Sequence, residues 1–242
     1  MDSITKKPFP RALLVLDILA AVSLAVALWM ALVYAPRELV MGDVQRVFYF
    51  HVASAWTGML GYLLAVITSI AFLRTGKMNL DVASLAGIEI GLVFTALCVI
   101  SGSIWARPIW NTWWTWDPRL TTAFIMELIY AAYLLLRRGV EDPAQRARLS
   151  AVYAIIGFIT VPLTFLSIRI FRTIHPVIFG GEASVGSSNF VMSSQMLQAF
   201  LFSLFAFTLL FAAFYWHRLR LGLRQQQIEA IELQRRQDEE EE

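Results

Sequence analysis

The sequence has few charged residues, and it contains a single cysteine. Only 16% of its 242 residues are charged, while 58% are hydrophobic, whereas a soluble domain carries about 25% charged residues. This leaves too little polar surface to cover a water-soluble globule, but enough to cover the ends of a helix bundle in lipid. The one cysteine, Cys98, excludes an intramolecular disulfide and a cysteine metal cage. It falls in an apolar run, which favours a role as a small packing residue.

A strong excess of positive charge is also missing. The formal net charge is +2, and the basic residues lie in short clusters between apolar runs. This is the usual pattern of membrane loops. Nucleic-acid binding would instead need the basic residues to be gathered into one patch or stripe. We therefore expect membrane lipid, and no nucleic acid, around this chain.

Long apolar runs are what the sequence has in abundance. A transmembrane helix needs about 20 consecutive apolar residues. Six runs qualify, over residues 12–35, 47–73, 82–104, 120–136, 149–168 and 193–216. They predict an all-α, polytopic membrane protein with six transmembrane helices. We assign residues 1–216 to the membrane domain and residues 217–242 to a charged cytoplasmic tail, either a solvated helix or a disordered end.

The distribution of Lys and Arg predicts the orientation of these helices. Of the 20 basic residues, 14 fall in the N-terminus, the second loop, the fourth loop and the tail, while 6 fall in the alternate segments. Short cytoplasmic loops carry the excess of basic residues. Both termini are therefore predicted to lie in the cytoplasm, and the first, third and fifth loops on the outer face.

Three features fall on this predicted outer face. His51 opens the second run, His175 lies in the loop after the fifth, and five of the eight tryptophans lie between Trp105 and Trp116. An interfacial aromatic belt would also place tryptophans at the membrane surface, but a belt spreads its rings over many helix ends. Concentration in one loop favours a ligand-binding platform.

The chemistry of these residues favours a planar aromatic ligand that carries carboxylates. Indole rings form a flat, polarisable, apolar wall, and Arg107 and Arg119 are candidates to meet ligand carboxylates. Neutral imidazole is the commonest protein ligand for haem iron, so His51 and His175 are candidate axial ligands. The platform residues are Trp105, Trp110, Trp113, Trp114, Trp116 and Asp117.

Three acidic residues, Asp17, Glu89 and Glu127, lie within the apolar runs. Such residues are costly in hydrocarbon and are candidates for function. We favour a structural role or a contact with a partner protein for all three. His217 follows the last run, where we expect it to complement the C-terminal end of a helix and assign it no ligand role.

The segment Trp113-Trp114-Thr115-Trp116-Asp117-Pro118-Arg119-Leu120-Thr121 resembles the tryptophan-rich WWD motif of haem-handling proteins. Ser101–Trp105 and Pro108–Trp110 extend the match. The short length, the six runs and the segment Val47-Phe48-Tyr49-Phe50-His51 are similar to one family within that group, the CcmC proteins of cytochrome c maturation.

This resemblance implies a function in some detail. CcmC proteins bind haem b at the outer, periplasmic face of the bacterial cytoplasmic membrane, with two axial histidines and the WWD loop. They present it to the haem chaperone CcmE and assemble with the CcmA, CcmB and CcmD subunits of an ABC-type transporter complex. Here His51 and His175 match the two histidines. The protein is then expected to bind and transfer haem rather than to act as an enzyme.

Three other functions remain open at this point. A membrane redox haem protein would need a second haem or a quinone site, and only three histidines are present. An ABC-type permease subunit would move solute through the bundle, and fold alone cannot exclude it. A complete cytochrome c synthase of the WWD group would be longer, with more spans and more histidines.

Overall fold

The computed structural model describes residues 9–176 and 192–241, and within them it consists of helices and connecting loops. The helices are α1 (Arg11–Trp29), α2 (Val47–Thr75), α3 (Met78–Trp110), α4 (Pro118–Gly139), α5 (Pro143–Gly157), α6 (Thr160–Ile170) and α7 (Ser194–Glu241). A short π-helix (Met30–Tyr34) extends α1, and a 3-10 turn (Asp43–Arg46) precedes α2.

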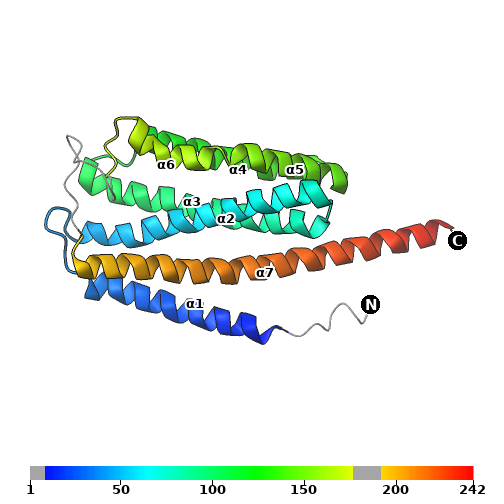
Figure 1. The fold of residues 1–242 in the computed structure, drawn as a ribbon, viewed down its shortest axis with the longest axis horizontal. Coiled ribbons are helices and arrows are strands. Elements are labelled where there is room, and N and C mark those ends of the chain that lie inside the picture. Colours follow the sequence, from blue (N-terminus) through cyan, green and yellow to red (C-terminus); the bar gives the residue numbers. More distant parts are fainter. Residues whose placement is uncertain (1–8, 177–191, 242) are drawn as a thin grey trace.

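Six segments of the described chain are long and apolar enough to cross a membrane, which confirms the predicted all-α membrane fold. Successive segments run in opposite directions, so their ends gather at two ends of the bundle (Figure 1). The connections before α2, between α3 and α4, after α6 and before α7 lie at one end, which we call the loop end. Helix α1 begins and α7 finishes at the other end, which we call the termini end.

Helices α2 and α3 pack closely against each other through glycines. A Cβ atom added to Gly61 would lie 2.5 Å from the carbonyl oxygen of Gly87, and one added to Gly87 would lie 2.6 Å from that of Gly61. Small residues allow helix backbones to approach this closely in membranes. These glycines therefore lie on the mutual contact face of the two helices.

Three helix boundaries differ from the sequence prediction. Helix α3 continues six residues beyond the apolar run, so Trp105 and Trp110 lie on it. The fifth membrane segment is broken around residues 158–159 into α5 and α6. Helix α7 continues through residue 217 to Glu241, so the predicted role of His217 at a helix C-terminus is wrong. Apolar length locates a helix, but it does not show where the backbone hydrogen bonding ends.

Ion pairs join the helices at the termini end. Arg137 of α4 donates to both carboxylate oxygens of Asp81 on α3, at 2.6 and 2.8 Å, and both side chains are nearly buried. Glu89 of α3 pairs with Arg218 of α7. The His217 Nε2 lies 3.0 Å from Asp17 of α1. These contacts favour the structural role that we expected for Asp17 and Glu89.

Glu127 lies nearer the middle of α4 and takes part in a different network. The Thr95 hydroxyl lies 2.5 Å from its carboxylate and 2.9 Å from the hydroxyl of Tyr62. The ring of Tyr62 stacks on Tyr130 with centroids 3.6 Å apart. One chain of hydrogen bonds therefore connects α2, α3 and α4, which also gives Glu127 a structural role.

Candidate functional site

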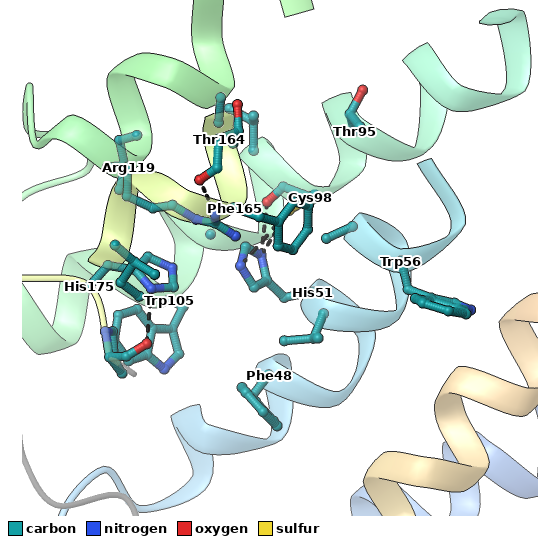
Figure 2. Close-up of a pocket in the computed structure, with 18 of the residues that line it drawn as sticks. Phe48, His51, Trp56, Thr95, Cys98, Trp105, Arg119, Thr164, Phe165 and His175 are labelled. Atoms are coloured by element: carbon teal, nitrogen blue, oxygen red, sulfur yellow. Dashed lines mark hydrogen bonds between the residues drawn. The ribbon is translucent and has the colours of Figure 1, made fainter. Parts of the chain in front are cut away.

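A cavity of about 600 Å³ lies at the loop end of the bundle, within the range of roughly 300–1,000 Å³ that is typical of small-molecule sites. His51 comes to it from the first turns of α2, Arg119 from the first turn of α4, and His175 from the segment after α6. Figure 2 shows these three side chains gathered around one space. The structure thus brings together residues that are 124 positions apart, from His51 to His175, as the sequence predicts.

The backbone of α3 holds the imidazole of His51. Its Nδ1 lies 2.9 Å from the carbonyl oxygen of Cys98 and 3.2 Å from the hydroxyl of Ser101. A carbonyl oxygen only accepts, so Nδ1 carries the proton and Nε2 keeps its lone pair. A Cβ atom on Gly102 would lie 2.9 Å from the His51 ring, so glycine makes room for the ring. Cys98 is therefore a neighbour of His51 and a lining residue as well as a packing residue.

The imidazole of His175 is held in a similar way. Its Nδ1 lies 3.2 Å from the carbonyl oxygen of Pro176, which again leaves Nε2 with the lone pair. Burial, followed by the nearby charge of Arg119 and the proximity of His51, lowers the pKa of His175 to about 3. The ring is therefore neutral at pH 7. The ring centroids of His51 and His175 lie 6.5 Å apart, with their planes 34° from parallel.

Asp117 positions the segment that carries His175. Its carboxylate accepts hydrogen bonds from the hydroxyl of Thr173, at 2.6 Å, and from the backbone N–H of Ile174, at 2.9 Å. The same hydroxyl accepts from the backbone N–H of His175, at 3.0 Å. Asp117 also caps the N-terminus of α4 through the N–H of Arg119. The carboxylate is therefore absent from the cavity wall, and it ties the tryptophan-rich loop to the His175 segment.

The two candidate arginines lie in different places. Arg119 lines the cavity, donates to the carbonyl oxygen of Thr164 on α6, and lies over the ring of Phe165, 4.7 Å from its centroid (Figure 2). Arg107 donates instead to the backbone and side-chain oxygens of Asn111, at 2.8 and 2.5 Å, beyond the end of α3. Of these two candidates, Arg119 is thus the one that lines the cavity and is placed to meet a carboxylate there.

Four of the five tryptophans between residues 105 and 116 line the cavity: Trp105, Trp110, Trp113 and Trp114. Trp110 lies edge-on to both Trp105 and His175, at centroid distances of 5.1 and 6.4 Å. Trp116 is 71% exposed and packs against Trp114 and Phe124, outside the cavity wall. The indoles thus form an angled wall rather than a flat stack.

Sequence reasoning missed the contribution of α6 and of the apolar side of α2. Thr164, Phe165 and Arg169 of α6 line the cavity, as do Trp56 and Met59 of α2. These residues lie inside ordinary apolar runs, and no motif marks them. Their position depends on the break between α5 and α6 and on the packing of α2, neither of which periodicity reveals.

The chain is similar to known proteins over most of its length. The family model described as "CcmC: Heme exporter protein C" matches residues 5–234. The chain belongs to the CcmC family. The heme exporter protein C of Bradyrhizobium diazoefficiens is 31% identical over 199 residues, which cover 82% of this chain and 74% of that protein. That of Escherichia coli K12 is 31% identical over 189 residues, covering 77% and 74%.

A plant relative extends the comparison beyond bacteria. A putative cytochrome c biosynthesis ccmC-like mitochondrial protein of Marchantia polymorpha is 31% identical over 151 residues, which cover 62% of this chain and 64% of that protein. Family membership supports a role of the chain in cytochrome c maturation, an association with haem and a place in a Ccm system with other subunits. The six apolar helices make it a membrane protein.

Proposed function

We propose that this chain holds haem b in the loop-end cavity, with His51 and His175 as the axial ligands of the iron. The observation that carries the proposal is the pair of imidazoles, 6.5 Å apart between centroids, each with Nδ1 bonded to a backbone carbonyl. Two imidazoles on opposite sides of one metal, with bonds of about 2 Å, have centres roughly 6 Å apart. A ligating histidine also usually donates its other ring N–H to a backbone carbonyl or a carboxylate, which fixes the orientation of the ring.

The wall of the cavity supports a porphyrin as the bound group. Trp105, Trp110, Trp113 and Trp114 offer apolar faces and edges to a planar ring system. Arg119 places a guanidinium beside both histidines, where it can pair with a haem propionate (Figure 2). Arg107, bonded to Asn111, is placed to meet a propionate only if it leaves that partner.

The site is suited to transfer rather than to permanent storage. Trp113 lines the cavity yet is 59% exposed, so one wall borders on solvent. The protein binds haem there and presents its accessible edge to the haem chaperone CcmE, while CcmA, CcmB and CcmD complete the complex. The cavity faces the periplasm, with both termini in the cytoplasm of a bacterial inner membrane. The protein binds and hands over haem and has no enzymatic activity of its own.

Haem transfer to co-expressed CcmE tests this function. Trp110→Ala with Trp114→Ala removes two indoles from the cavity wall, and we expect much less covalent haem on CcmE, measured by haem staining of the purified chaperone. Trp29→Ala is the matched control, because Trp29 is exposed on α1 and is not among the residues that line the cavity. An unchanged amount of haem on CcmE with the double variant would contradict the proposal that these tryptophans form the haem-binding wall.

A further inference from the structure

A second groove lies toward the termini end, outside the haem site. It has a volume of about 870 Å³ and lies between Phe9, two residues before α1, and the helices α3 and α7. Its lining changes character along its length. One part is apolar, with Ile90, Val93 and Phe94 from α3 and Phe214 from α7, and the other part is basic, with Arg218, Arg220 and Arg224 from α7.

The basic part of the groove retains positive charge after its ion pairs are taken into account. Arg218 is paired with Glu89, and His217 with Asp17. Arg220 lies over the ring of Phe9, 5.0 Å from its centroid. Neither Arg220 nor Arg224 forms an ion pair with a carboxylate of the described chain. The groove therefore offers two cationic side chains to a ligand.

The change from apolar to basic lining coincides with the expected membrane boundary. On α7 the apolar run ends at Trp216 and the basic residues follow immediately. On α3 the exposed side chains of Val93, Leu97 and Ile100 continue from the groove toward the loop end. A ligand in the groove would thus lie partly in hydrocarbon and partly at the headgroup level.

We propose that this groove binds an anionic phospholipid of the leaflet at the termini end. The phosphate lies against Arg220 and Arg224, and an acyl chain lies against Val93, Phe94 and Phe214. Two features support this occupant. The arginines carry charge opposite to the phosphate, and they follow directly after the apolar run of α7, where anionic headgroups attract basic residues. The lipid would also cover the pair Glu89–Arg218, whose side chains are 32% and 24% exposed and costly to leave against hydrocarbon.

Native mass spectrometry of the detergent-purified full chain tests the proposal, with phosphatidylglycerol and phosphatidylcholine of the same acyl chains as probes. We expect phosphatidylglycerol to be retained in preference to phosphatidylcholine. Arg220→Gln with Arg224→Gln should lower its retention by roughly tenfold or more, as expected from removing two cationic side chains beside an anionic headgroup. Equal retention of the two lipids, or unchanged retention by the double variant, would overturn the proposal.

Two control variants show whether retention depends on the groove itself. Arg235→Gln with Arg236→Gln makes the same change of charge on α7 outside the groove and should leave retention unchanged; an equal loss would show a non-specific charge effect. Val93→Trp fills the apolar part and should weaken retention, whereas Ile67→Trp, on an exposed position of α2, should not. Haem absorption should be the same in all variants, so the outcome is independent of the haem site.

Two further results would also contradict the proposal. Displacement of the lipid by millimolar inorganic phosphate would show that the groove binds an anion without using its apolar wall. The second result concerns the double variant Arg220→Gln with Arg224→Gln. If it keeps the lipid but loses a membrane protein that co-purifies with the wild type, that result would show that the groove is a protein interface.

Discussion

The two ends of the bundle satisfy their polar groups in different ways. At the termini end, side chains of opposite charge pair across helices, as Asp81 does with Arg137 and Glu89 with Arg218. Around the loop-end cavity, His51, His175 and Arg119 bond to backbone carbonyl oxygens. Side chains that pair with each other have their charged groups occupied and unavailable to a ligand. Bonding to the backbone holds the rings in place while Nε2 remains available to a ligand.

Two aspartates that cap helices, one at each end of the bundle, also differ in their hydrogen-bond partners. Asp117 and Asp142 each cap a helix that begins with proline, at α4 and α5 respectively. The carboxylate of Asp142 accepts from the N–H of Gln145, three residues along the same helix. Asp117 makes two more hydrogen bonds, to the segment that carries His175. The same cap is structural at one end and also positions a candidate ligand at the other.

The largest expected effect comes from removing the two loop-end histidines. His51→Ala with His175→Ala should abolish the haem Soret band of the purified protein, because both candidate iron ligands are lost. His217→Ala removes the third histidine, at the termini end, and should leave the band unchanged. Normal haem binding by the double variant would show that the loop-end histidines are not the iron ligands, and the contrast between the two ends would fail.

Breaking a termini-end ion pair should affect stability and not haem. Asp81→Asn leaves Arg137 nearly buried without its charged partner, which costs about 3–5 kcal/mol when such a pair is fully desolvated. We expect a clearly lower unfolding temperature in detergent, with the same haem bound per folded molecule. Glu239→Gln breaks an exposed pair on α7 and should change neither. A loss of haem in Asp81→Asn at low temperature would contradict this separation.

Weakening the hydrogen bonds from Asp117 to the His175 segment should reduce haem binding to an intermediate degree. Asp117→Asn removes the charge that holds Thr173 and Ile174, and hydrogen bonds to charged groups contribute about 1.5–3 kcal/mol, so the haem dissociation constant should rise by about tenfold or more. Thr173→Val should act in the same direction without altering the helix cap. Asp142→Asn is the matched control, and haem titration measures all three. An equal effect of the control would mean that capping alone is responsible.

The smallest expected effect concerns acid stability without haem. The pKa of His175 in the folded protein is about 3, below the ordinary value of about 6.5. As the pH falls below 6.5, the unfolded chain takes up a proton at this residue that the folded chain does not, so stability is lost between pH 6.5 and 3. His175→Gln should lose less stability over this range in thermal unfolding measurements. Identical pH profiles would contradict the low pKa.

The sequence was sufficient for the parts of the site that a local motif marks. The tryptophan-rich segment, His51 and His175 were all found from residue type and from the parity of six helices, and the structure places them around one cavity. It was insufficient for Trp116 and Arg107, because their neighbours in the chain do not show which way a side chain points. The contributions of α6 were also missed, since Thr164 and Phe165 look like ordinary residues of an apolar helix.

The membrane class, the six helices and the family all follow from the amino-acid sequence, because apolar length and the WWD motif are properties of the chain read in order. The folded chain was needed to show that Asp117 reaches Thr173 and Ile174, that Arg119 rather than Arg107 lines the cavity, and that Glu89 meets Arg218. The contacts of Asp117 and Glu89 join residues that are 56–129 positions apart. Their geometry depends on where each helix ends and how closely it packs, which no local pattern encodes.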